Sequence, residues 1–146
     1  MTSGAKQVVA GAVEAFNAHD ASRIRATYAD DAVLEAPGDV RLVGPDANTE
    51  FLMGWVNAFP DGLWTVNNEV ASGDWVVDQI TFEGTHEAPL PGPDGKIPAT
   101  HRRIAIRGVE VFRIVGDKIA EDHIYYDQVQ FLEQLGVMPV AAEASA

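Results

Sequence analysis

The period of the hydrophobic pattern changes near residue 62, and this change constrains the fold more than any other feature. Before it, apolar side chains recur at helical spacing over residues 4–18 and 45–59. After it, polar and apolar residues alternate in segments rich in Val, Ile and aromatic residues, which lie at 63–71, 75–85, 102–115 and 118–127. Helices followed by long antiparallel strands form an α+β pattern. We therefore expect a curved antiparallel sheet wrapped around N-terminal helices, a cone whose open end is a natural pocket.

Shorter elements complete this plan. A short helix capped near Asp20 and a strand over residues 32–36 are expected between the two main helices. A last helix ends at Gly136, and a loose tail is expected over about 137–146. The length of 146 residues suits one domain and there is no internal repeat, so we expect one domain over residues 1–146.

Composition excludes several classes of function. The chain has 22 acidic against 10 basic residues and a formal charge of −12, which disfavours nucleic acid and anionic membrane surfaces as partners. It has no cysteine, so disulfides and thiol nucleophiles are excluded and a reducing compartment is favoured. The N-terminal segment does not resemble a signal peptide, and no apolar run is long enough to span a membrane. We expect a cytoplasmic protein that acts on a small molecule.

A proline-rich stretch interrupts the strands at residues 87–101, with prolines at positions 89, 91, 93 and 98. Proline cannot donate a hydrogen bond to a sheet, so this stretch is predicted to be a stiff excursion without strands. It is interpreted either as a lid over the pocket or as a long hairpin loop.

The hairpin of residues 102–127 predicts a face with unusual chemistry. If Gly116 and Asp117 form a two-residue turn, Val115 pairs with Lys118, and alternation then fixes which side chains share a face. That face combines an apolar end with a polar end, and its members are Glu110, Phe112, Ile114, Ile119, Glu121, His123, Tyr125 and Asp127. Buried carboxylates near an imidazole can transfer protons. The alternative interpretation is a solvated strand face.

Other catalytic chemistries find little support. The four histidines lack the spacing of metal ligands, and the three lysines lie in terminal, loop or turn positions, which does not suit a Schiff base. No nucleotide-binding fingerprint is present, so neither a metal nor a cofactor is expected. His86, at the end of a strand, is either a core histidine or a catalytic residue.

A series of short motifs resembles a known family. The motifs are Phe59-Pro60-Asp61, Gly84-Thr85-His86, Phe112-Arg113-Ile114, Lys118-Ile119, Asp127 and Gln134-Leu135-Gly136, over about residues 5–139. In order and spacing they resemble the SnoaL-like polyketide cyclases, which share a fold with nuclear transport factor 2 and ketosteroid isomerase. The resemblance implies a homo-oligomer, a dimer or tetramer, and an intramolecular aldol ring closure in antibiotic-type biosynthesis without metal or Schiff base. The family's catalytic aspartate corresponds to Asp127, as general base.

The leading hypothesis is a cyclase in which Asp127 is the base, helped by His123 and His86. The predicted substrate contacts are Tyr125, Trp55, Phe112, Glu121 and Phe59. His123 stands where many relatives have tryptophan, which changes the expected cavity. Two alternatives are an epoxide hydrolase or isomerase on the same fold and a non-catalytic module for ligand binding or dimerisation. The Asp-Arg-Asp arrangement of such hydrolases is not found in residues 75–127.

Overall fold

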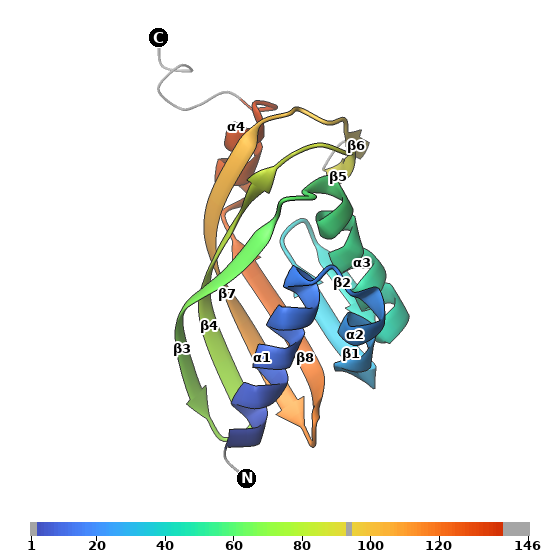
Figure 1. Ribbon diagram of the computed structural model, residues 1–146, viewed down its shortest axis with the longest axis vertical. Coiled ribbons are helices and arrows are strands. Elements are labelled where there is room, and N and C mark those ends of the chain that lie inside the picture. The colour runs from blue at the N-terminus through green and yellow to red at the C-terminus, as the bar shows by residue number, and fades with distance from the viewer. Residues whose placement is uncertain (1–2, 93–94, 139–146) are drawn as a thin grey trace.

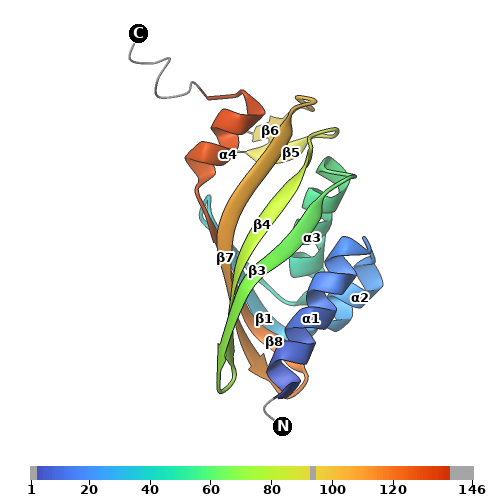
Figure 2. The ribbon, with the colours of Figure 1, turned by 60° about the vertical axis from the view of Figure 1, so that its left-hand side comes forward.

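A strongly curved sheet wraps around helices in the computed structural model, which describes residues 3–92 and 95–138. The six strands are ordered β2-β1-β8-β7-β4-β3, and α1 and α3 lie on the concave side (Figures 1 and 2). In chain order the described elements are α1 (Ser3–Asn17), α2 (Ala21–Ala26), β1 (Tyr28–Ala36), β2 (Val40–Val43), α3 (Pro45–Ala58), β3 (Leu63–Ser72), β4 (Trp75–Thr85), β5 (Leu90–Gly92), β6 (Gly95–Ile97), β7 (Arg103–Val115), β8 (Lys118–Tyr126) and α4 (Gln128–Leu135). The α+β cone expected from the change of period is confirmed.

Polar side chains fix the first helices against the sheet. The Asn17 amide donates to the backbone oxygen of Trp64 and its carbonyl accepts from the backbone nitrogen of Trp64, both at 2.9 Å. The end of α1 is thereby held on β3. The Asp20 side chain accepts from the backbone nitrogen of Arg23 and caps α2, as predicted.

The strand β1 is longer than its sequence pattern suggested, and its pairing was not predicted. It runs antiparallel to the unpredicted strand β2 and parallel to β8, so β8 lies inside the sheet. The parallel pairing joins segments about ninety residues apart, as in the partners Leu34 and Asp122. No local pattern encodes such a contact.

The expectation of a strand-free stretch at residues 87–101 is wrong. Residues Leu90 and Ile97 face each other in the small antiparallel pair of β5 and β6, and both side chains are buried in the core. Pro91 is tolerated because this isolated pair has a free edge on each strand. Residues 93 and 94 lie outside the described part of the chain, as does most of the expected tail at 137–146.

A β-bulge at Ala120 corrects the predicted faces of the hairpin. Ile114 pairs with Ile119 as expected, but Arg113 pairs with Glu121, so Ala120 is an extra residue on β8. Beyond the bulge the even-numbered residues of β8 face the concave side. The three side chains that move to the convex side, against expectation, are Glu121, His123 and Tyr125.

The core inside the cone has two halves. One cluster surrounds Phe59, Phe82 and Phe131 near the open end, and the other contains Tyr28 and Phe112 near the narrow end. Partly buried side chains from α3, β3 and β8 pack against both clusters, and these are Leu52, Met53, Trp64 and Tyr126. The buried carboxyl groups lie on β4, β7 and β8, the strands that surround the second cluster. They are therefore found toward the narrow end of the cone.

Candidate functional site

The open end of the cone carries a large apolar groove, which we call the mouth groove. Its volume is about 630 Å³, within the range of small-molecule sites. Its walls come from β2, α3, β5, β6, β8 and α4, and its lining residues include Val40, Leu42, Phe51, Trp55, Leu90, Ile97, Tyr126, Gln128 and Phe131. Trp55 packs against Tyr126 and Phe131 with ring centroids 5.9 and 5.1 Å apart. The groove is therefore suited to an apolar ligand.

Two smaller cavities continue from the groove toward the narrow end. The middle cavity, about 30 Å³, shares Phe51, Trp55 and Tyr126 with the mouth groove. The deep cavity, about 40 Å³, shares a second set of side chains with the middle one, namely Phe16, Leu52 and Trp64. A volume of 40 Å³ holds a few water molecules or the end of a larger ligand. The shared side chains place the three spaces next to one another.

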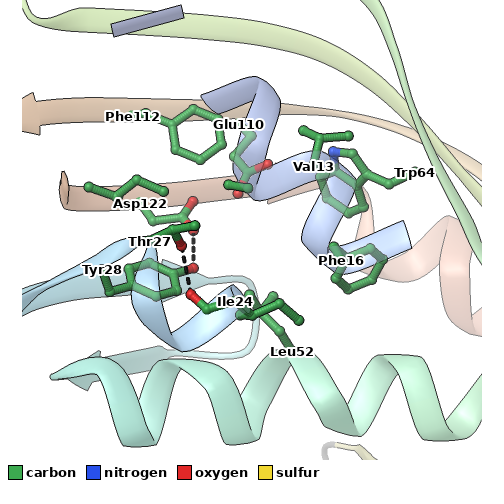
Figure 3. Close-up of a pocket in the computed structure, with 12 residues that line it drawn as sticks. Val13, Phe16, Ile24, Thr27, Tyr28, Leu52, Trp64, Glu110, Phe112 and Asp122 are labelled. Carbon is green, nitrogen blue, oxygen red and sulfur yellow. Dashed lines mark hydrogen bonds between the residues drawn. The ribbon is translucent and has the colours of Figure 1, made fainter. Parts of the chain in front are cut away.

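The deep cavity is lined by an acidic cluster in an otherwise apolar wall (Figure 3). The Tyr28 hydroxyl donates to Asp122 Oδ2 at 2.7 Å, and both residues are buried. Glu110, from the neighbouring strand β7, is 7% exposed and its carboxyl group lies beside that of Asp122. The site thus places two carboxyl groups and a phenol around one small cavity.

Burial raises the pKa of both carboxyl groups, but their hydrogen bonds act on the two in opposite directions. Desolvation, the charge of Asp122 and their shared hydrogen bond raise the pKa of Glu110 well above its ordinary value. Desolvation also raises the pKa of Asp122, but hydrogen bonds from Glu110 and Tyr28 act against that rise. Glu110 is therefore the group of the pair that more readily keeps its proton, and Asp122 is the better candidate for the carboxylate. Two neighbouring acids with different protonation states are an acid and a base.

The structure brings only some of the predicted site residues to these cavities. Trp55 lines the mouth groove and the middle cavity, and Phe112 lines the deep cavity. Phe59 is completely buried in the core, where it stacks on Trp55 at 5.7 Å between ring centroids. Tyr125 is 56% exposed on the convex face.

His123 and Glu121 form an ion-pair network on the convex face. The imidazole Nδ1 lies 2.8 Å from Glu35 Oε1, and Nε2 lies 2.9 Å from Glu121 Oε1. Arg113 Nε donates to the other oxygen of Glu121 at 2.6 Å. Burial lowers the pKa of His123, but the hydrogen bonds and charges of Glu121 and Glu35 outweigh it and the net shift is upward. These contacts lie on the far side of the sheet from the cavities.

His86 has the contacts of a structural residue. It is fully buried, and its Nδ1 accepts from the backbone nitrogen of Thr100 at 3.1 Å, with the Thr100 hydroxyl 3.0 Å away. Burial lowers the pKa of the imidazole, which favours the neutral form. The residue ties the end of β4 to the segment before β7.

Asp127 is exposed at the rim of the mouth groove. Its carboxylate accepts from the backbone nitrogen of Gln130 at 3.1 Å and caps α4. Its neighbours Tyr126 and Gln128 line the groove. An exposed N-cap is a common structural role for aspartate, and proximity to the groove is what keeps a catalytic role open.

Sequence reasoning placed Asp122 on the wrong face and passed over Tyr28 and Asp78. One signal was present for Asp78, since it occupies an inward position between Val76 and Ile80 in an alternating strand. A charged residue at an apolar position of a strand pattern marks a buried polar group. For Asp122 the bulge removed any such signal.

Neither a metal site nor a spanning helix emerges from the described residues. Over 3–92 and 95–138, no three His, Asp or Glu side chains group so that they could hold a metal ion. None of the helices in that part of the chain is long and apolar enough to cross a membrane.

A family model for the SnoaL-like polyketide cyclases matches residues 6–135. The chain belongs to this family. Its motifs had suggested this membership, and solved relatives with the ketosteroid isomerase-like fold agree with the architecture of the cyclase family. Membership of this family suggests a catalytic role for the cone but does not identify the reaction.

Solved structures similar to this cyclase-family chain differ in their reported activities. AclR, a proposed hydroxylase from Streptomyces galilaeus, is 26% identical with a TM-score of 0.80, over 95% of this chain and 100% of that one. IdmH, a proposed polyketide cyclase from Streptomyces antibioticus, is 28% identical with a TM-score of 0.75, over 91% and 99% of the two chains. An LEH-like epoxide hydrolase from M. tuberculosis, 19% identical with a TM-score of 0.71 over 92% and 86%, shares the fold. No protein of curated function matches the sequence.

Proposed function

We propose that this protein is an acid–base catalyst that removes a proton from an activated carbon of a polyketide-like carbonyl compound, the first step of an aldol-type cyclisation. The observation that carries the proposal is the pair of buried carboxyl groups, Glu110 and Asp122, at the deep cavity. Perturbed carboxyl groups that meet in a concave apolar site are the usual sign of proton-transfer chemistry.

Each group of the cluster has a distinct role in this proposal. The Asp122 carboxylate takes the proton from carbon, and the substrate's own carbonyl groups delocalise the resulting enolate. Glu110, which already holds a proton, returns one to the oxygen that becomes an alkoxide when the new carbon–carbon bond forms. The Tyr28 hydroxyl holds Asp122 in place through its 2.7 Å hydrogen bond.

The walls of the cavities indicate the ligand's character. No Lys, Arg or His is among the described residues that line the three spaces, so an anionic ligand would find no counter-charge there. The body of the ligand occupies the mouth groove against Trp55 and Tyr126. Its reactive end passes Leu52 and Trp64 into the deep cavity. The expected substrate is therefore neutral and largely apolar.

A second candidate for the base is Asp127, as the family resemblance suggests. Its neighbours in sequence, Tyr126 and Gln128, line the mouth groove, so a ligand there would pass near its carboxylate. Against this, the Asp127 carboxylate is exposed and its hydrogen bond to the backbone nitrogen of Gln130 already commits it to capping α4. In either version His123 acts only indirectly, because it lies on the convex face.

A deuterium-exchange assay separates the two candidates without the natural substrate. An aryl β-keto ester serves as the probe, and NMR follows the loss of deuterium from the carbon between its carbonyl groups. Asp122→Asn should slow the catalysed exchange by about 10²- to 10⁴-fold, the usual value of a positioned proton-transfer group. Asp127→Asn is the matched control, since asparagine caps a helix as well as aspartate does.

The outcomes distinguish Asp122 from Asp127 as the base, and a proton-transfer catalyst from a ligand-binding module or an epoxide hydrolase. Loss of exchange in Asp127→Asn with full exchange in Asp122→Asn would assign the base to the mouth and contradict the deep pair. Probe binding without catalysed exchange in the wild type would favour a non-catalytic ligand-binding module. Hydrolysis of an epoxide panel in labelled water, with no exchange, would favour the hydrolase alternative.

A further inference from the structure

Four carboxyl residues form a continuous row across the concave side of the sheet. Glu69 on β3 pairs with Asp78 on β4, and Asp78 pairs with Glu110 on β7. On β8 the residue opposite Glu110 is Ile124. Asp122 lies two residues before it on the same face, diagonal to Glu110. We call Glu69, Asp78, Glu110 and Asp122 the carboxyl row. Residues directly opposite in antiparallel strands have Cβ atoms roughly 4.5–5.5 Å apart, within hydrogen-bonding range for carboxyl groups or for one bridging water.

The two ends of the carboxyl row differ in exposure. Asp122 is 1% exposed and lines the deep cavity, whereas Glu69 is partly exposed on β3, the edge strand of the sheet. The row therefore runs from the proposed site to solvent by a route that does not pass through the mouth groove. Helix α1 packs across β3, β4 and β7 and covers this side of the sheet.

Asp78 is the least explained member of the row. Its side chain is fully buried, and neither of its oxygens accepts from an N–H or hydroxyl group among the described residues, so the carboxyl group of Glu69 is its polar neighbour. Desolvation, a hydrogen bond with Glu69 and the charge of Glu69 raise the pKa of Asp78 to about 8. Asp78 is therefore mostly protonated at neutral pH. Nothing in the proposed chemistry at the deep cavity uses it.

We propose that the carboxyl row is a proton path that connects the deep cavity to solvent at the β3 edge. The inference rests on the proposed function, because only a site that transfers protons needs such a path. While a ligand fills the mouth groove, the path lets the protons held by Glu110 and Asp122 exchange with solvent from the opposite side. At each step a carboxyl group accepts a proton on one oxygen and releases one from the other. One O–H bond forms for each that breaks, and one proton moves in total.

The Tyr28 hydroxyl reports on this path without any substrate. It donates to Asp122 and lines the deep cavity, so the mouth groove is first filled with an apolar dye, which leaves the inner end of the row as the route by which this proton exchanges with solvent. The chain has three tyrosines, so protein labelled with ¹³C at tyrosine Cζ gives three resonances, and Tyr28→Phe assigns one of them. In mixed H₂O and D₂O the hydroxyl and deuteroxyl forms differ in shift, and their interconversion gives the exchange rate.

Asparagine at position 78 copies the shape and neutral charge of a protonated aspartic acid but cannot relay a proton. Asp78→Asn and Glu69→Gln should each slow exchange of the Tyr28 hydroxyl by about 10- to 100-fold. Asp31→Asn, an exposed carboxylate on the same strand as Tyr28, is the matched control and should leave the rate unchanged. Amide spectra verify that each variant is folded, and Glu69→Gln at the partly exposed end provides the test if Asp78→Asn does not fold.

An unchanged Tyr28 exchange rate in either folded variant would overturn the proton path. This outcome is distinct from failure of the proposed function. If Asp122→Asn abolishes exchange of the β-keto ester while Asp78→Asn leaves Tyr28 exchange untouched, the catalytic pair stands and the path does not. If Asp122→Asn has no effect on the β-keto ester, the proposed function fails whatever the Tyr28 measurement shows.

Discussion

Burying a carboxyl group lowers the free energy of unfolding at any pH where that group would be ionised in the unfolded chain. Asp78, Glu110 and Asp122 are all buried, and burial raises the pKa of each of them. A raised folded-state pKa means that the folded protein holds a proton that the unfolded chain releases, so stability falls as pH rises between the two values. Residues retained at such a cost are good candidates for function.

Asp78→Asn should raise the free energy of unfolding. The pKa of Asp78 is about 8 in the folded protein, so the wild type loses stability between about pH 4 and pH 8 and the asparagine variant does not. We expect a gain of up to about 5 kcal/mol at pH 7.5 that disappears below about pH 4. Urea unfolding at several pH values measures this difference. A variant less stable than wild type at pH 7.5 would show that Asp78 is ionised and satisfied there.

His123→Gln should show the opposite pH dependence. The pKa of His123 is raised in the folded protein, so its ion pairs stabilise fully below about pH 6.5 and lose their effect as pH rises through the folded value. The wild type should exceed the variant by roughly 0.5–1 kcal/mol at pH 5.5 and by less at pH 8.5, a modest value because Glu35 and Glu121 are partly exposed. Unfolding curves at both pH values measure the gap, and a gap that does not change with pH would contradict the role given to the imidazole.

At the scale of elements, sequence patterns predicted what is local and missed what is not. Amphipathic periodicity located α1 and α3, alternation located β3, β4, β7 and β8, and the cap at Asp20 is confirmed. The parallel pairing of β1 with β8 joins distant segments and leaves no local signature. The bulge at Ala120 displaced the predicted faces by one residue, which moved Asp122 into the site and His123 out of it.

The bulge gives a direct test at this scale. Deleting Ala120 leaves Ile119 and Asp122 on the concave side, because the remaining residues alternate as an unbulged strand would. Inserting an alanine between Glu121 and Asp122 would turn Asp122 and Ile124 outward. We expect the deletion to cost about 1–2 kcal/mol and the insertion to prevent cooperative folding. Thermal unfolding of both variants measures this, and a stable insertion variant would contradict the assigned register.

At the scale of the whole molecule, the mouth groove, the middle cavity and the deep cavity follow one another from the open end of the cone to its narrow end. The mouth groove offers volume, the deep cavity offers acids, and Leu52 and Trp64 line the space between them. The sequence predicted the cone and an apolar pocket, but the acids at its narrow end depend on how the strands register. The homo-oligomer that the family resemblance implies stays a prediction.

Leu52→Phe should separate ligand binding from catalysis. A larger side chain at this position narrows the passage to the deep cavity, and overpacking should cost roughly 1–3 kcal/mol of stability. We expect fluorescence of an apolar dye in the mouth groove to be retained while deuterium exchange of the β-keto ester is lost. Leu42→Phe, which alters only the groove wall, serves as the matched control. Full exchange in Leu52→Phe would show that the reaction does not require the deep cavity.

The protonation state of the deep pair is the central claim, and carboxyl ¹³C NMR measures it directly. Protein labelled at the side-chain carboxyl carbons of Glu and Asp is titrated, with Glu110→Gln and Asp122→Asn used to assign the two resonances. The pKa of Glu110 is raised well above its ordinary value by burial beside Asp122, so its carbon should have the shift of a protonated acid at pH 7. Asp122 should have the shift of a carboxylate at the same pH. Two carboxylate shifts at pH 7, titrating at the ordinary pKa values of Glu and Asp, would contradict the account.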